Sequence, residues 1–206
     1  MNTSGVGNSL QIDFSQAVAS GDIQTLIQMI QGERVRLLDA QLVDQVKAVQ
    51  ARNDQIAKLN NVLSALTKFQ GAIKGTDAGS KVSDWNWDKV DQYEIPLNDA
   101  IREAGIGDLG LTGAGRVTPE PGQSLDDGHG HVLQGQTNTS NGDTTKGQID
   151  AAITKIKGLI DAESNNQQMD MLRLQSLNNK KNESVEILTN TQKKHTDGAS
   201  NIIRNI

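Results

Sequence analysis

Apolar side chains recur every three or four residues along two long stretches of the 206-residue chain. This spacing places them on one face of an α-helix. The first stretch spans residues 22–74, the second spans residues 147–206, and no proline interrupts either one. We therefore predict two long helices, which we call the first arm and the second arm.

Local signals predict where the arms begin and end. Ser20 or Asp22 is suited to cap the start of the first arm, and Gly71 and Gly75 mark its end. The second arm opens with Thr145-Lys-Gly-Gln148. This spacing is typical of a capping box, in which two side chains satisfy free backbone donors at a helix start.

A long helix with one apolar stripe needs a partner, because most helical stability in water comes from packing. The simplest partner is the other arm, which predicts an antiparallel coiled coil. Polar residues also fall on the stripes, at Asn53, Lys181, Gln192 and His195. The predicted seam comprises Leu42, Val46, Val49, Ile56, Leu59, Leu63 and Leu66 in the first arm and Ile153, Ile156, Ile160, Met171, Leu174, Leu177, Val185 and Leu188 in the second.

The segment between the arms differs in kind. Residues 75–147 hold 13 of the 20 glycines, all three prolines and both tryptophans. Residues 96–104 read as a short helix closed by Gly105, and residues 116–118 and 131–134 read as short strands. The predicted fold is therefore mainly α, with a small Gly-rich α+β lobe over residues 75–146 inserted between the arms.

Most of the aromatic area lies in this lobe, at Trp85, Trp87 and Tyr93. These residues fit a miniature core for the lobe. They also fit a docking patch, since Trp and Tyr are favoured anchors at interfaces. Helical or strand periodicity does not distinguish the two roles.

Composition argues against an enzyme. Hydrophobic residues make up 35% of the chain, below the roughly 45% usual for globular domains, and aromatic residues make up only 2%. A thin core with few large side chains does not favour a deep ligand site. There is no cysteine, which excludes disulfides and thiol chemistry. We predict no catalytic residue and no cofactor.

Two motifs resemble ligand sites but lack the required context. Residues 105–110 match G-x-G-x-x-G, yet they follow a predicted helix, whereas a dinucleotide site follows a buried strand. Asp126-Asp-Gly-His-Gly-His131 is the best metal candidate. Its glycines leave the side chains unorganised, so no metal site is predicted there.

Charge and hydropathy limit the partners further. The net charge is −5, and residues 75–147 hold 12 acidic and 5 basic residues, a balance of −7. No basic stripe is present, so nucleic acid is not an expected partner. No segment approaches the roughly 20 apolar residues that span a bilayer, so direct membrane insertion is not expected. Residues 1–21 read as a mobile polar leader without a cleavable secretory signal.

Long strings in the chain resemble a known family. Gln167-Gln-Met-Asp-Met-Leu-Arg-Leu-Gln-Ser-Leu-Asn-Asn-Lys-Lys-Asn-Glu183, Leu59-Asn-Asn-Val-Leu-Ser-Ala-Leu66 and Ile95-Pro-Leu-Asn-Asp-Ala-Ile-Arg-Glu-Ala-Gly105 are similar to the tip-filament proteins of Bordetella-type type III secretion systems. The likeness covers residues 22–74 and 147–206 and fades over residues 106–146. More distantly, the layout resembles needle-tip and tip-filament proteins of attaching enteropathogens.

The resemblance implies a secreted subunit of a hollow helical filament at the tip of the secretion needle. The implied partners are further copies of the chain, the needle subunit, pore-forming translocators and a cytosolic secretion chaperone. The implied location is extracellular, on the bacterial surface, after synthesis in the cytoplasm. Residues 1–21 would then carry an uncleaved export signal, and Ile202, Ile203 and Ile206 would pack between subunits.

Composition alone leaves other functions open. A cytosolic coiled-coil adaptor or secretion chaperone fits the same two arms. A flagellin-like or phage-tail tube protein shares the plan of terminal helices around a central insert. An enzyme fits least, because no set of residues meets the requirements of an active site.

Overall fold

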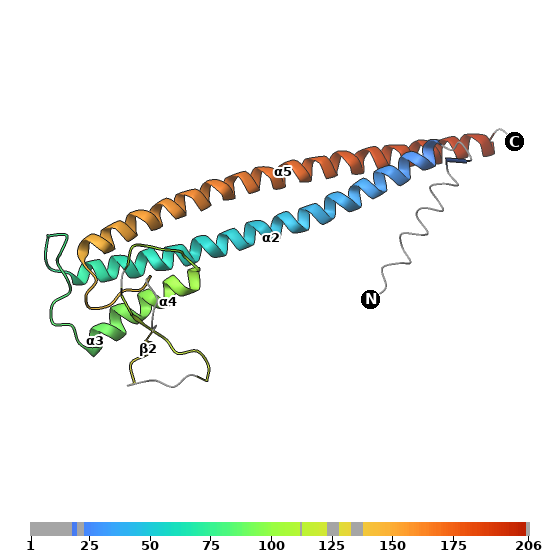
Figure 1. The fold of residues 1–206 in the computed structure, drawn as a ribbon. Coiled ribbons are helices and arrows are strands. Elements are labelled where there is room, and N and C mark those ends of the chain that lie inside the picture. Colours follow the sequence, from blue (N-terminus) through green and yellow to red (C-terminus); the bar gives the residue numbers. More distant parts are fainter. Residues whose placement is uncertain (1–17, 20–22, 112, 123–127, 133–137, 205–206) are drawn as a thin grey trace. The chain divides into compact units, whose positions relative to one another are not determined.

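The computed structural model describes residues 18–19, 23–111, 113–122, 128–132 and 138–204. Within these ranges the chain is mainly helical with little strand, and the long helices α2 (Ile23–Ala72) and α5 (Lys146–Arg204) pack together (Figure 1). The predicted mainly α class and the two long helices are therefore confirmed. Most of the predicted leader over residues 1–21 lies outside the described residues.

The chain divides into two compact units. The central unit is Gln50–Gln168, and the terminal unit combines Met1–Val49 with Met169–Ile206. The division falls inside both long helices and not at residues 74 and 146, where the sequence changes composition. Residues 50–72 of α2 and 146–168 of α5 thus belong to the same compact unit as the lobe.

The start of α5 has the predicted capping box. The backbone N–H of Thr145 donates to Oε1 of Gln148 at 2.9 Å, and the N–H of Gln148 donates to Oγ1 of Thr145 at 3.4 Å. Two backbone donors that the helix itself leaves free are satisfied in this way. The predicted helix start at residues 145–148 is confirmed.

Three consecutive helical pieces form one side of the lobe. They are α3 (Trp87–Lys89), the π-helical turn η1 (Val90–Glu94) and α4 (Ile95–Ala104). The predicted helix over residues 96–104 is α4, and it ends at Gly105, whose φ of 61° is left-handed. The first glycine of the G-x-G-x-x-G motif therefore ends a helix, as its context predicts. The sequence analysis missed α3 and η1.

The two predicted strands form a small antiparallel hairpin. Strand β1 (Arg116–Val117) pairs with β2 (His131–Val132), with Arg116 opposite Val132 and Val117 opposite His131. Strand β1 is one residue shorter than predicted. Residues 133–134 of the predicted second strand lie outside the described residues.

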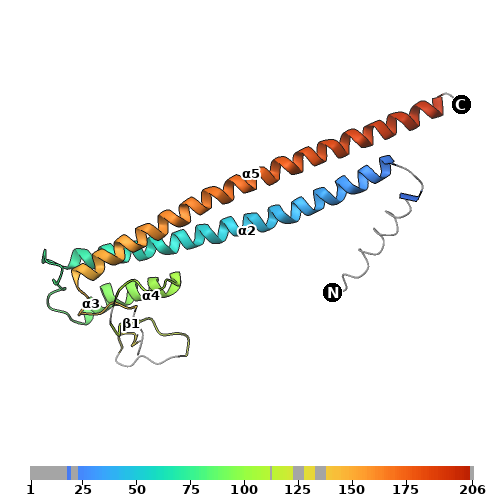
Figure 2. The same ribbon diagram turned by 45° about the horizontal axis from the view of Figure 1, so that its top comes forward.

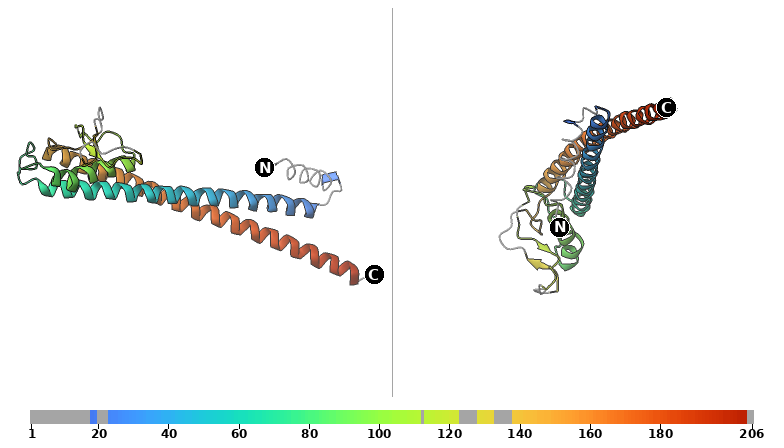
Figure 3. Two further views of the ribbon diagram at one scale, coloured as in Figure 1. Left: turned by 90° about the horizontal axis from the view of Figure 1, so that it is seen from below. Right: turned by 90° about the vertical axis from the view of Figure 1, so that its right-hand side faces the viewer.

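The core of the central unit is built from three helices, because α4 packs with α2 and α5 (Figures 2 and 3). Leu97, Ile101 and Ala104 line one face of α4 at helical spacing and are all buried. The remaining buried apolar residues of this core are Leu59, Val62, Leu66, Phe69, Ile73, Val82, Leu109, Leu111, Ile149, Ala152 and Ile156. This third helix explains why the central unit has a full core despite the low apolar content of the chain.

Candidate interaction surfaces

The three aromatic residues of the lobe have different environments. The ring of Phe69 lies 5.8 Å from that of Trp85 and 6.2 Å from that of Tyr93, measured between centroids. Both partners are half-buried and pack against the core. Trp85 and Tyr93 therefore extend the core of the central unit, which is the first of the two predicted roles.

Trp87 lies outside this core, and 45% of it is exposed. Its ring stacks on that of His129, with centroids 4.5 Å apart and planes 5° apart. The guanidinium of Arg116 also lies over it, 4.8 Å from the centroid. Trp87 is thus the member of the trio that is accessible on the surface of the lobe.

The predicted seam in the central unit follows the observed core only in part. Leu59, Leu66 and Ile156 are buried, whereas Ile56, Leu63, Ile153 and Ile160 are half-buried. The predicted seam omits Val62, Phe69, Ile149 and Ala152, which are all buried. A seam between two helices has one contact line, but α4 adds a second contact surface and widens the buried face of α2.

The predicted seam is weaker in the terminal unit. Leu42, Val49, Leu174, Leu177 and Leu188 are half-buried. Val46, Met171 and Val185 are 42%, 49% and 39% exposed, so their assignment to a buried seam within the chain is corrected. Among the described residues of this unit, Leu38 is the buried large apolar side chain; it precedes Leu42 by four residues on the same apolar stripe but is not part of the predicted seam.

Polar contacts connect α2 and α5 in the terminal unit. Nε2 of Gln45, a buried residue, donates to Oδ1 of Asp170 at 3.1 Å. Nζ of Lys181 lies 2.6 Å from Oδ1 of Asp39. Ser184 is fully buried and donates to the carbonyl of Lys180 in its own helix. Polar side chains thus fill part of the space that an apolar seam would occupy.

Large apolar side chains remain exposed along the terminal unit. Ile30 is 53% exposed, Met169 is 67% exposed and Leu172 is 61% exposed. Exposed apolar side chains can contact a protein partner, and a large exposed apolar area commonly marks an interaction site. The exposed set on α2 and α5 of this unit, which we call the terminal apolar surface, comprises Ile23, Ile27, Ile30, Leu37, Val43, Val46, Met169, Met171, Leu172 and Val185.

A buried amide connects α4 with β1 and with the segment before α5. Nδ2 of Asn98 donates to the carbonyls of Arg116 and Ser140, at 2.9 and 3.0 Å. Its Oδ1 accepts from the backbone N–H of Ser140 at 2.7 Å and from Oγ of the same residue at 3.1 Å. The side chain of Asn98 therefore provides hydrogen-bond partners for backbone groups of β1 and of the segment before α5.

A buried carboxyl lies beside this amide. Glu94 is only 3% exposed, and its Oε1 accepts the backbone N–H of Arg116 at 2.8 Å. Burial raises the pKa of Glu94 to about 7, and the Arg116 hydrogen bond and guanidinium charge oppose that shift only in part. No sequence pattern marked Glu94, because a single Glu between a Tyr and an Ile reads as surface.

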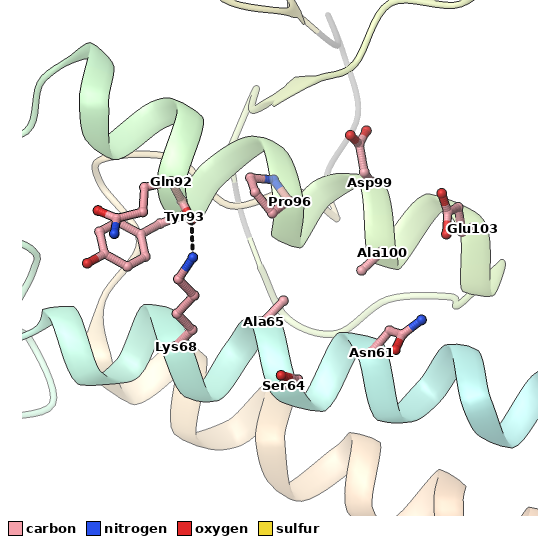
Figure 4. Close-up of a pocket in the computed structure, with 10 residues that line it drawn as sticks. All are labelled: Asn61, Ser64, Ala65, Lys68, Gln92, Tyr93, Pro96, Asp99, Ala100 and Glu103. Carbon is pink, nitrogen blue, oxygen red and sulfur yellow. Dashed lines mark hydrogen bonds between the residues drawn. The ribbon is translucent and has the colours of Figure 1, made fainter.

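A shallow groove of about 330 Å³ runs between α2 and the η1–α4 segment (Figure 4). Nζ of Lys68 lies in it, donates to the carbonyl of Gln92 at 3.2 Å and faces the ring of Tyr93. Asp99 at its edge already binds Thr118 and Arg102. The groove is lined by Asn61, Ser64, Ala65, Lys68, Gln92, Tyr93, Pro96, Asp99, Ala100 and Glu103, a mixed set without the convergent polar groups of an active site.

The described part of the chain holds no group of three or more metal-ligating side chains. Nδ1 of His129 lies 3.1 Å from the carboxylate of Asp91, and His131 lies on β2. Asp126 and Asp127 of the metal candidate lie outside the described residues. Among the helices described, none has a stretch that is both long and apolar enough to cross a membrane.

The residues predicted to form a subunit interface lie at the C-terminal end of the chain. Helix α5 ends at Arg204, and the side chains of Ile202, Ile203 and Ile206 lie outside what the structure describes. The same holds for the side chain of His195.

Comparison of the chain with protein-family models, with curated proteins and with solved structures finds no match.

Proposed function

We propose that this chain is the structural subunit of an extracellular helical filament at the tip of a type III secretion needle. The filament would be a hollow conduit for translocators and effectors. The proposal is based on the resemblance of three strings, residues 59–66, 95–105 and 167–183. They fall in α2, in α4 with its cap, and in α5 respectively.

The terminal apolar surface is the observation that supports assembly most strongly. In the terminal unit the described residues bury one large apolar side chain, Leu38, while eleven others are exposed, ten of them on α2 and α5. A stable protein interface covers about 800 Å² on each partner, and ten such side chains offer apolar surface on that order. A surface of this size in water favours association.

Further copies of the chain are the partner that the filament requires. Contacts that join different patches of identical subunits do not close on themselves and so generate helical polymers. The terminal apolar surface lies on both α2 and α5, so each subunit can offer one helix to each of two neighbours.

Within a subunit, the proposal includes an antiparallel coiled coil of α2 and α5. Arg52 pairs with Glu163 at 2.6 Å, and Gln70 binds Asp150 in the central unit. In the terminal unit, Asp39 pairs with Lys181 and Gln45 binds Asp170. In each unit the partner number on α5 falls as the number on α2 rises, which is the order that antiparallel helices produce.

The remaining partners follow from the proposed place of assembly. The filament would sit on the needle subunit at its base and meet pore-forming translocators at its far end. The chain would be made in the cytoplasm and then secreted. A cytosolic secretion chaperone would cover the terminal apolar surface before export, because the exposed side chains would otherwise associate too early.

Electron microscopy of the purified full-length chain by negative stain tests the proposal, together with its distribution between culture supernatant and lysate under secretion-inducing conditions. Filaments, and a secreted pool that disappears when the needle is removed, are expected. Discrete dimers confined to the lysate would refute the filament and favour an adaptor or secretion chaperone. Filaments released without a needle would favour a flagellin-like tube protein.

A pair of substitutions in α5 tests the surface itself. Leu172 is 61% exposed in the terminal unit, and Leu159 is 39% exposed in the central unit. Burying a leucine contributes about 1.5–3 kcal/mol, so Leu172→Gln should raise the concentration needed for polymerisation about tenfold or more. Leu159→Gln is the matched control and should leave it unchanged. Equal effects of the two variants would contradict the assignment of the terminal apolar surface.

A further inference from the structure

The β1–β2 hairpin is held to the central unit largely through Arg116. Its backbone N–H donates to Glu94 and its carbonyl accepts from Asn98. Its guanidinium donates to the carbonyls of His129 and Gly130, at 3.3 and 3.5 Å. One residue of β1 thus connects η1, α4 and the residues that lead into β2.

The other strand of the hairpin is fixed through an imidazole ring. His129, two residues before β2 begins, stacks on Trp87 of α3 and pairs with Asp91 of η1. Arg116 lies over the same indole. The junction of the hairpin with α3 and η1 therefore contains a guanidinium, an indole and an imidazole.

Glu94 is the buried carboxyl at this junction. In the docked hairpin it is buried, and its pKa is about 7. If the hairpin separated from η1, water would reach the carboxyl, and its pKa would return toward the ordinary value near 4.5. The two arrangements therefore bind protons differently, and pH must shift the balance between them.

We propose that the β1–β2 hairpin is a proton-operated latch, in which proton binding by Glu94 tightens its docking and proton loss loosens it. This inference concerns the lobe and does not depend on the proposed filament function.

The direction of the effect follows from the charges. Glu94 has a raised pKa in the docked state, so its contribution is fully present below about pH 4.5 and is lost as the pH rises through about 7. His129 contributes contacts to the same junction, because its ring stacks on Trp87 and its Nδ1 lies beside Asp91.

The other charged groups that face the hairpin lie on α4. Asp99 accepts the backbone N–H of Thr118, the residue after β1, at 3.0 Å. Arg102 donates to the carbonyl of the same residue at 3.2 Å and pairs with Asp99 at 3.1 Å. This pair secures the exit of β1 and is separate from the junction at Glu94.

Hydrogen exchange and fluorescence on the full chain test the latch. The protection of the amides at residues 116–117 and 131–132, corrected for intrinsic exchange, should fall about tenfold or more between pH 5.5 and 8. The limit set by the shift of Glu94 is roughly 300-fold. Trp85→Phe leaves Trp87 as the sole indole, and its emission should change over the same range.

Three variants test which side chain causes the pH dependence. Glu94→Gln keeps an oxygen for the Arg116 N–H but cannot ionise, so the fall in protection should shrink. His129→Phe keeps a ring against Trp87 but removes the contact with Asp91, so the fall in protection that Glu94 causes should remain. Glu103→Gln, an exposed carboxyl of α4, is the control and should behave as the wild type.

Two results would overturn the latch. The first is hairpin protection that stays constant from pH 5.5 to 8 in the wild-type chain. The second is a wild-type fall that persists unchanged in Glu94→Gln. Because the first result needs only the wild-type chain, a folding defect in Glu94→Gln leaves it as the test.

Discussion

Replacing Asn98 with leucine should loosen the lobe of the central unit. Asn98 is 1% exposed and makes four hydrogen bonds, two as donor and two as acceptor. Leucine has a similar size and fits a helix well, so the change leaves no large cavity and keeps α4. The substitution therefore isolates the loss of the polar contacts.

The size of the destabilisation depends on how many buried backbone groups Asn98→Leu leaves without a hydrogen-bond partner. The backbone N–H of Ser140 and the carbonyls of Arg116 and Ser140 would lose the Asn98 side chain as a partner. An unsatisfied buried polar group costs about 1–3 kcal/mol, and some of these groups would reach water as the loops shift. We expect a loss of about 2–4 kcal/mol in the free energy of unfolding of the central unit, a large share of the stability of a typical domain.

Chemical denaturation followed by circular dichroism measures the overall loss, and hydrogen exchange locates it. The amides at residues 116–117 and 139–141 should lose protection, while those of residues 30–45 of α2 should keep it. Asn60→Leu is the matched control, because Asn60 is exposed on α2 and its side chain binds only the carbonyl of Ile56 in its own helix. That control should stay within about 0.5 kcal/mol of the wild type.

An Asn98→Leu variant as stable as Asn60→Leu would refute this reasoning. It would mean that water or rearranged loops satisfy the backbone groups at no cost, and that Asn98 does not hold the hairpin. Asn98→Asp gives a second test. The carboxylate keeps both acceptor contacts but turns two donor contacts into repulsion between oxygens, so its destabilisation should be greater at pH 7 than at pH 4.

Two further predictions concern α5. Thr145→Ala should cost about 1 kcal/mol of unfolding free energy in denaturant titrations, because it removes one half of the capping box, whereas Thr154→Ala at an exposed interior position should cost less. Deleting residues 199–206 should leave the helical circular dichroism largely intact and abolish polymers in negative stain, and polymers that persist unchanged would show that Ile202, Ile203 and Ile206 form no subunit interface.

Much of the fold could be predicted because its signals are local. Spacings of three and four residues predicted α2 and α5, the Thr145–Gln148 capping box predicted the start of α5, and Gly105 predicted the end of α4. Each of these depends on contacts within one or two helical turns. Helices α3 and η1 carry no such apolar spacing, so the analysis missed them.

The buried faces were less predictable because they depend on distant packing. Leu38 and Val46 lie on one apolar stripe of α2, yet Leu38 is buried and Val46 is exposed. Which positions of the stripe are buried depends on how α2 packs against α5, and no local signal fixes that packing. Glu94 and Asn98 illustrate the same limit, since both lie in ordinary polar sequence and become buried only when β1 and the segment before α5 pack against α4.

The two units differ in how they cover their helices, and this difference bears on assembly. In the central unit α4 is a third helix, and it lets α2 bury side chains such as Val62 that a two-helix pair would leave partly open. The described part of the terminal unit has α2 and α5 without such a third helix, and Ile30 and Leu172 remain exposed there.

Under the proposed function, helices of neighbouring subunits take the role that α4 has in the central unit. Folding of the terminal unit and polymerisation then become linked equilibria, so the terminal unit gains stability as the protein concentration rises, while the central unit is stable without a partner.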